Sequence, residues 1–321
     1  MKTQLTQNYR ACGSEPADVA ILMCTYNGAA YLHEQLESLH AQTFSNWTLY
    51  VSDDASTDGT LEILADYQHR WGERRIMIFD GPRQGFGKNF VSLIKRPEVK
   101  ACYYAFSDQD DVWFSDKLQR SVELLESVDK QTPGLYCSRT RLIDKTGKVI
   151  GFSPRFRRPP SFRNALVQSI AGANTMMVNH AARKVLMLVP EDATIVAHDW
   201  LTYIIVSACG GKALYDDKPS LDYRQHDGNL IGANTSFKDR MTRILKMFSG
   251  RFVEWNDANI LILEAMQPYI SEDSRTTLNH FASGRHMKLL GRICEFHKSG
   301  VYRQTAGSTI TLIIAACLGR L

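Results

Sequence analysis

Residues 106–113 read Phe-Ser-Asp-Gln-Asp-Asp-Val-Trp, so three carboxylates directly follow an apolar segment. The residues before them, 103–106, are Tyr-Tyr-Ala-Phe and predict a buried strand. The acidic side chains would then emerge at the carboxyl end of that strand, where open α/β sheets bind ligands. Carboxylates this close repel one another unless a cation lies between them, and oxygen ligands suit Mg²⁺ or Mn²⁺. A solvated acidic turn is the alternative.

The first half of the chain alternates strand-like and helix-like segments around this stretch. The expected strands are Val19–Cys24, Trp47–Val51, Ile76–Phe79 and Tyr103–Phe106, and helical spacing occupies residues 29–42, the residues after Asp58-Gly59, and Phe90–Ile94. Repeated β-α units need crossover connections and so favour parallel strands. We therefore expect an α/β protein with a Rossmann-like, mostly parallel sheet flanked by helices.

The second half is more mixed in pattern. A helix is expected from Asp116 to about Val128, a hairpin from 135–143 with 149–152, a strand at 175–178, a helix at 198–208, and two short strands at 213–215 and 221–224. From Phe237 the spacing becomes helical. These shifts predict a polar N-terminal extension at 1–18, a catalytic domain at 19–236 and a basic α-helical appendage at 237–321.

Composition excludes several classes of protein. A hydrophobic content of 44% with 22% charged residues is typical of a folded soluble protein. Seven cysteines without a CxxC pair argue against a disulfide framework or a zinc site, and they predict a cytoplasmic location. The polar N-terminus predicts no signal peptide, and the apolar run at 310–318 is far shorter than the roughly 20 residues that span a bilayer. With a pI of about 8.6 and no nucleic-acid-binding motif, no nucleic acid partner is expected.

The basic excess of the chain lies at its C-terminal end. Residues 237–321 contain 12 Lys+Arg against 7 Asp+Glu, whereas residues 1–236 contain 26 against 27. In residues 285–321 the bases alternate with Leu, Ile and Phe at helical spacing. Such a segment can lie on the anionic inner face of a membrane, and it can equally pack against another domain or form a homodimer.

Four motifs occur in a fixed order along the chain. They are Cys24-Thr25-Tyr26-Asn27-Gly28, Ser52-Asp53-Asp54-Ala55-Ser56-Thr57-Asp58-Gly59-Thr60, Ser107-Asp108-Gln109-Asp110-Asp111-Val112-Trp113 and His198-Asp199-Trp200. Through them the chain resembles family 2 glycosyltransferases with the so-called A-type fold, from Val19 to about Gly232. With Tyr223-Arg224-Gln225-His226 added, it is similar to bacterial rhamnosyltransferases that build cell-surface polysaccharides.

The resemblance implies that the nucleotide of a sugar donor lies at the ends of the first two strands. Thr25, Tyr26, Asn27 and Asp54 are the expected donor-binding residues there, with Asp53 in support. A tyrosine ring can stack on a pyrimidine, and an Asp can accept a hydrogen bond from its N3–H. The alternative is that these residues form turns and that the two acids cap the next helix.

The same resemblance makes Asp108-Gln109-Asp110 an Asp-x-Asp element that holds a divalent ion, Mg²⁺ or Mn²⁺, on the donor diphosphate. Asp110 is the first expected ligand, Asp108 reaches the ribose or a metal-bound water, and Asp111 and Trp113 support them. His226 would complete the metal shell or contact the diphosphate, with Arg224 supplying positive charge to the donor. A structural histidine is the alternative for His226.

Asp199 is the catalytic base that the resemblance implies, with His198 and Trp200 in support; capping of a helix is its alternative role. One base opposite the leaving group implies inversion, so a β-linked dTDP-L-rhamnose would give an α-L-rhamnoside. The expected acceptor is a glycan, lipid-linked at the cytoplasmic membrane, in O-antigen or other surface polysaccharide synthesis. A UDP-hexose donor and an inactive nucleotide-binding scaffold remain the competing hypotheses.

Overall fold

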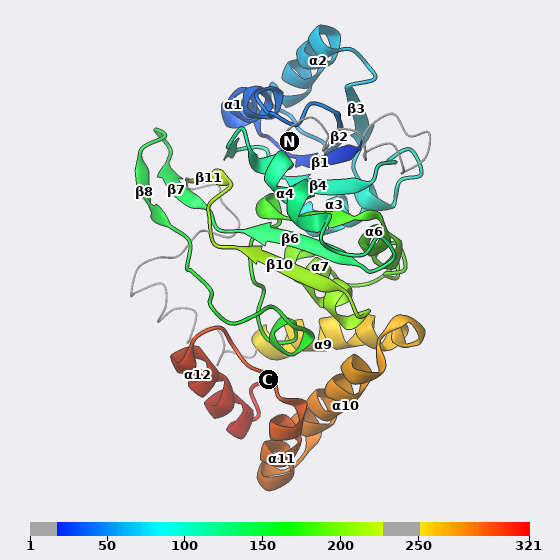
Figure 1. Cartoon of the computed structure of the whole chain (residues 1–321), viewed down its shortest axis with the longest axis vertical. Helices are drawn as coiled ribbons and strands as arrows, with labels where there is room; N and C mark the ends of the chain where they lie inside the picture. Colours follow the sequence, from blue (N-terminus) through cyan, green and yellow to red (C-terminus); the bar gives the residue numbers. More distant parts are fainter. Residues whose placement is uncertain (1–17, 227–250) are drawn as a thin grey trace, which may run out of the picture.

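A seven-stranded mixed sheet forms the centre of the protein in a computed structural model that describes residues 18–226 and 251–321 (Figure 1). The strand order is β10-β6-β9-β4-β1-β2-β3. The strands are β1 Val19–Thr25, β2 Trp47–Asp53, β3 Ile76–Asp80, β4 Tyr103–Ser107, β6 Gly134–Ser138, β9 Met177–Asn179 and β10 Lys212–Asp216. Every pairing is parallel except those of β9 with β4 and β6. The expected mostly parallel sheet is confirmed.

Helices cover both faces of this sheet (Figure 1). They are α1 Ala29–His40, α2 Thr60–Trp71, α3 Phe86–Lys95, α4 Lys117–Leu125, α5 Phe162–Ala165, α6 His180–Leu186 and α7 His198–Ala208. Alternate side chains of β1 point to opposite faces, as a strand dictates. Val19 and Ile21 pack with α1, α2 and α4, whereas Ala20 and Leu22 pack with α3, α6 and α7.

A second sheet, absent from the sequence prediction, lies beside the first. Its order is β5-β11-β7-β8, with β5 Val112–Trp113, β11 Leu221–Gln225, β7 Arg141–Asp144 and β8 Val149–Phe152. The expected hairpin from residue 135 was therefore wrong in its first half, because 134–138 joins the large sheet. The apolar pattern breaks at Arg139-Thr140, whose polar groups bond to Ser153, and the chain changes sheets there.

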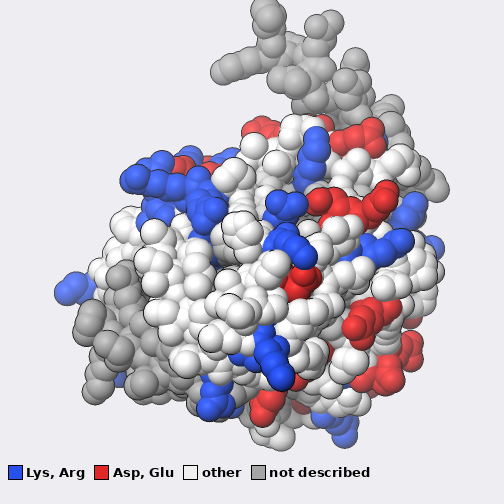
Figure 2. Space-filling view, turned by 90° about the horizontal axis from the view of Figure 1, so that it is seen from below, with Lys and Arg blue, Asp and Glu red and all other residues white. Residues whose placement is uncertain are grey.

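Four C-terminal helices complete the described chain at the lower end of Figure 1, and Figure 2 views the molecule from that end. They are α9 Arg251–Ala265, α10 Glu272–His286, α11 Leu289–Ser299 and α12 Ala306–Cys317. Their apolar residues share one core cluster with α7, where the Trp200 ring stacks on Phe252. The expected domain boundary at 236/237 and the first helical turns after Phe237 lie outside the described residues.

The structure bears on two further expectations, which concern membrane-spanning segments and the state of the cysteines. Across the two described ranges, no helix is both long and apolar enough to cross a membrane. The thiols of Cys24, Cys137, Cys209, Cys294 and Cys317 are free, but Cys102 is disulfide-bonded, contrary to the expectation from cysteine count.

Candidate active site

The acidic stretch lies where the sequence pattern placed it, at the carboxyl end of β4. The strands β1 and β2 pair in parallel with each other, and β1 pairs in parallel with β4. Their carboxyl ends therefore meet at one edge of the sheet. This edge brings together Tyr26 after β1, Asp54 after β2 and Asp108 after β4.

Gln109 joins the acidic stretch to the end of β1. Its Oε1 accepts a hydrogen bond from the Tyr26 backbone N–H at 2.9 Å, and its Nε2 donates to the Tyr26 carbonyl at 3.0 Å. A side chain at Gly28 would collide with the same amide, since a Cβ there would lie 2.3 Å from Gln109 Oε1. The sequence analysis assigned no role to Gln109. Only its position in the middle of the Asp-x-Asp element could have indicated that it belongs to the site.

Thr25, Asn27 and Asp53 hold together the two loops that follow β1 and β2. The Asp53 carboxylate accepts bonds from the Thr25 hydroxyl at 2.7 Å and from the Ser56 hydroxyl at 2.6 Å. The Asn27 amide oxygen accepts from the Thr57 N–H at 2.8 Å. The side chains of these three residues are thus engaged within the protein.

The side chains of Asp54 and Tyr26 make other contacts than those of Thr25, Asn27 and Asp53. The Asp54 carboxylate accepts hydrogen bonds from the backbone N–H groups of Arg83 at 2.5 Å and Gly85 at 3.0 Å. Both donors have positive φ, +58° and +84°, so the carboxylate holds a strained loop. The Tyr26 side chain is 60% exposed and presents its ring to solvent. The N-cap of α2 is Gly59, so neither Asp53 nor Asp54 caps this helix.

His226 and Asp110 come together from β11 and the acidic stretch. His226 Nε2 lies 2.9 Å from Asp110 Oδ2, and the His226 ring packs against Tyr31 of α1 with centroids 4.9 Å apart. Arg224 is buried, donates from Nε to the Asp110 carbonyl at 3.1 Å and forms an ion pair with Glu34 of α1. Tyr31 and Glu34 are site residues that sequence reasoning missed, although they follow the Asn27-Gly28 turn directly.

Asp111 is fully buried and faces inward. It accepts from the Asn174 amide at 2.7 Å and from the Arg224 backbone N–H at 3.4 Å. Beside it, the ammonium of Lys117 lies 4.0 Å from the centre of the Trp113 ring, and burial lowers its pKa to about 7. Trp113 is itself buried, so it supports the acidic stretch from below. No sequence pattern indicated that Asn174 and Lys117 belong to this cluster.

The electrostatics of the acidic stretch favour a bound cation. Burial, followed by the charges of Asp110 and Asp199, raises the pKa of Asp108 to about 7. Burial and the charges of Asp110 and Asp108 likewise raise the pKa of Asp111 well above its usual value. A divalent cation between these groups would relieve the repulsion that raises both values.

A metal shell is not fully assembled by protein groups alone. Within residues 18–226 and 251–321, no three His, Cys, Asp or Glu side chains are gathered closely enough to hold an ion. Asp110 and His226 nonetheless touch, and Mg²⁺ is commonly held by one or two protein ligands together with substrate phosphates. The pair therefore fits an ion whose remaining ligands come from a donor diphosphate and water.

Asp199 lies in the first turn of α7, close enough to Asp108 for its charge to act on that carboxyl. Burial raises the pKa of Asp199 to about 6, and its charge is among the causes of the raised pKa of Asp108. Its Oδ1 accepts from the Trp200 N–H at 2.7 Å, while the N-cap of α7 is Ala197. A carboxylate with this pKa is ionised at neutral pH and basic enough to accept a proton.

The neighbours of Asp199 hold α7 in the core. His198 stacks on Phe90 with centroids 4.0 Å apart, and burial lowers the pKa of His198 to about 3, so the ring is neutral. The Trp200 indole donates to the Ala165 carbonyl at 2.6 Å. Both side chains that flank Asp199 along the chain are therefore engaged within the protein.

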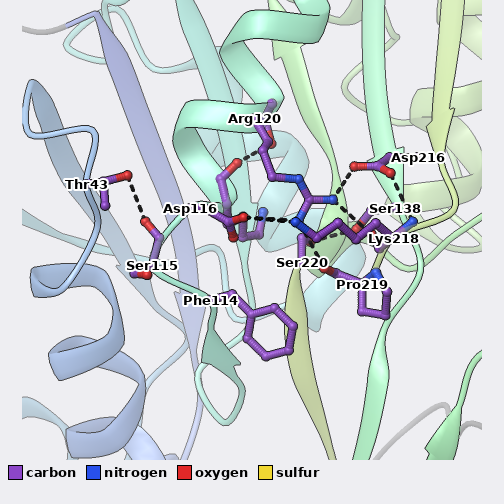
Figure 3. A network of polar contacts seen from close by, with 12 residues as sticks. Thr43, Phe114, Ser115, Asp116, Arg120, Ser138, Asp216, Lys218, Pro219 and Ser220 are labelled. Atoms are coloured by element: carbon purple, nitrogen blue, oxygen red, sulfur yellow. Dashed lines mark hydrogen bonds and ion pairs between the residues drawn. The ribbon is translucent and has the colours of Figure 1, made fainter.

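A polar network fixes the start of β11, the strand whose end carries Arg224 and His226 (Figure 3). Arg120 of α4 forms ion pairs with Asp116 and with Asp216 at the end of β10, and it donates to the Pro219 carbonyl at 3.1 Å. The Phe114 N–H donates to the Ser220 carbonyl at 3.0 Å, which continues the pairing of β5 with β11. The acidic stretch and β11 are thus held as one unit.

Comparisons with known proteins agree with this geometry. Residues 20–183 match the sequence profile of glycosyl transferase family 2. The chain belongs to glycosyltransferase family 2. It is 30% identical to the dTDP-rhamnosyl transferase RfbG of Shigella flexneri over 234 residues, which cover 69% of this chain and 78% of that protein.

Solved structures show that the fold is the glycosyltransferase A-type. S. aureus TarS 1–349 in complex with UDP is similar with a TM-score of 0.54 and 16% identity, over 94% of this chain and 88% of that one. The mannosyltransferase PcManGT of Pyrobaculum calidifontis, in complex with GDP-Man and Mn²⁺, gives a TM-score of 0.50 and 16% identity, over 96% of this chain and 86% of that one. The family match and the similarity to RfbG show that the protein is a glycosyltransferase, as its motifs predicted.

Proposed function

We propose that this glycosyltransferase moves L-rhamnose from dTDP-L-rhamnose to a lipid-linked glycan acceptor, with Mg²⁺ or Mn²⁺ and with inversion at the anomeric carbon. The observation that supports the reaction type is a buried Asp199 carboxylate, with its pKa raised to about 6, close enough to Asp108 for its charge to act on it. The similarity to the dTDP-rhamnosyl transferase RfbG over most of both chains supports the choice of sugar and nucleotide. Its acceptor belongs to surface polysaccharide synthesis at the cytoplasmic face of the membrane.

In this proposal the donor lies along the edge where β1, β2 and β4 end. The exposed Tyr26 ring stacks on the thymine, and Asp54, whose backbone N–H donates to the Thr25 carbonyl at 2.9 Å, would accept a hydrogen bond from the base. Asp110 and His226 would hold the divalent ion, which supplies Lewis-acid stabilisation of the departing nucleoside diphosphate. Arg224 is engaged with Glu34 and the Asp110 carbonyl, so it acts by shaping the ligand pair.

Asp199 carries out the proton transfer. Its carboxylate accepts the proton of the acceptor hydroxyl while that oxygen forms a bond to C1 of the sugar. The bond from C1 to the diphosphate oxygen breaks at the same time, so the nucleoside diphosphate leaves with the electron pair. One displacement of a β-linked donor gives an α-L-rhamnoside.

The test separates binding from turnover in the variant Asp199→Asn. Donor affinity, measured by calorimetry, should stay within about twofold, whereas transfer should fall about 10²–10⁴-fold because the general base is gone. Glu191→Gln is the matched control, since Glu191 is an exposed acid on the segment before α7. Undiminished transfer by Asp199→Asn, or a β-L-rhamnoside product by NMR, would contradict the proposal.

A further inference from the structure

The end of the molecule formed by α11 and α12 exposes an unusual number of large apolar side chains. Eight of the 19 exposed large apolar residues in the described chain fall within the last 35 positions. We call them the C-terminal apolar face: Met287, Leu289, Leu290, Ile293, Ile310, Ile313, Ile314 and Leu318. Scattered exposed apolar residues are normal, but a concentration of them marks an interaction surface.

The apolar face of α12 is a stripe that points away from the protein core. Leu312, Ala315 and Ala316 are buried and pack inward. Ile310, Ile314 and Leu318 recur at four-residue spacing on the other side and are 58%, 47% and 63% exposed. A helix with a second apolar side left in solvent is typical of a helix that meets another apolar phase.

The helix α11 repeats this arrangement. Its inward side meets α10, where Glu295 contacts His280 at 2.6 Å and a Cβ at Gly284 would lie 3.1 Å from Glu295 Cβ. Leu290, 83% exposed, and Ile293 are outside this contact. Arg292 then joins the two helices, because its guanidinium donates to the carbonyls of Ala316 and Cys317 at the end of α12. The two stripes therefore adjoin where α11 meets α12.

Charge around this face is one-sided. Residues 286–321 contain five Lys and Arg but one acid, Glu295, which is already paired with Lys298 and His280. Figure 2, which looks onto this end of the molecule, shows blue side chains scattered over a largely uncoloured surface, with most red side chains toward the right. In a symmetric dimer through this face, the same bases would confront one another. An anionic surface complements them instead.

We propose that the C-terminal apolar face docks the enzyme on an anionic lipid bilayer, with α11 and α12 lying in the headgroup region. The apolar stripes enter the interface while the exposed side chains of Lys288 and Arg320 contact lipid phosphates. The benefit of this docking rests on the lipid-linked acceptor proposed above, but the docking needs neither donor nor acceptor.

Vesicle co-sedimentation of the full chain tests the docking. The protein should bind vesicles of phosphatidylcholine with 40% phosphatidylglycerol about tenfold or more tightly than phosphatidylcholine alone, and 0.5 M salt should weaken this binding. Leu290→Glu should reduce it by about tenfold or more, because it removes an inserted side chain and adds repulsion. The matched control is Ile150→Glu on β8, where Ile150 is 55% exposed and lies outside the face; it should bind like the unmodified protein.

Three results would overturn the docking proposal: no preference for anionic vesicles, equal binding by Leu290→Glu, or equal loss in Ile150→Glu. A concentration-dependent dimer that Leu290→Glu dissociates, without vesicle binding, would assign the face to a second copy of the chain. Because sedimentation uses no sugar nucleotide, failure of rhamnosyl transfer would leave this result unchanged, and the reverse also holds.

Discussion

The raised pKa of Asp199 predicts how transfer depends on pH. Burial raises this pKa to about 6, and the base acts only when ionised. A group with that pKa is about 99% ionised at pH 8 and about 9% ionised at pH 5. The value of kcat/KM, which reports the free enzyme, should therefore fall about tenfold from pH 8 to pH 5.

The assay is release of nucleoside diphosphate at subsaturating donor, with acceptor present, across pH 5–8. Thermal unfolding followed at each pH serves as the control for loss of folded protein. In Asp199→Asn, the residual kcat/KM should no longer fall with a midpoint near pH 6. A flat profile between pH 5 and pH 7, or the same fall in Asp199→Asn, would refute the assignment of Asp199 as the base.

Three further predictions address the acidic stretch. Chelator should abolish transfer and Mg²⁺ or Mn²⁺ should restore it, with His226→Ala requiring about 10–100-fold more metal; full transfer in chelator would contradict the metal assignment. Asp108→Asn should lose activity, yet its free energy of unfolding at pH 8 in metal-free buffer should be about 1–2 kcal/mol higher than that of the unmodified protein. The reason is that a carboxyl whose pKa is raised to about 7 in the folded state destabilises that state once it is ionised. This increase in unfolding free energy should vanish below about pH 4, and chemical denaturation at both pH values measures it. An unchanged or lower unfolding free energy at pH 8 would argue against repulsion among the buried carboxylates. Gln109→Ala should weaken donor binding about tenfold by freeing the Tyr26 loop, whereas unchanged affinity in calorimetry would show that the loop needs no such support.

Local patterns were enough to predict most of the large sheet. The strands at 19–25, 47–53, 76–80 and 103–107 are mostly apolar and end in polar residues, and the helix at 198–208 has the bounds that its spacing predicted. Such signals depend only on neighbours in the sequence. The change of sheet at Arg139-Thr140 was not predicted, because only pairing with distant Ser153 and β11 reveals the second sheet.

The candidate site was predictable as a set of motifs but not as a set of roles. Asp108, Asp110 and Asp199 lie close enough together for the charges of the last two to raise the pKa of Asp108. Whether a side chain faces a ligand or the protein depends on long-range contacts that no motif contains. Arg224 is the example, because its partner Glu34 lies 190 residues away along the chain. The hydrogen bond from Asn174 to Asp111 could not be predicted for the same reason.

Selection of the donor tests the central claim most directly. The purified chain would be given dTDP-L-rhamnose, other dTDP-sugars, UDP-hexoses and GDP-mannose in turn, with Mg²⁺ or Mn²⁺, and nucleotide release and donor binding would be measured. We expect metal-dependent binding and turnover of dTDP-L-rhamnose well above the others. Equal or better use of a UDP-hexose would contradict the rhamnosyl assignment, and failure to bind any sugar nucleotide would contradict the catalytic role itself.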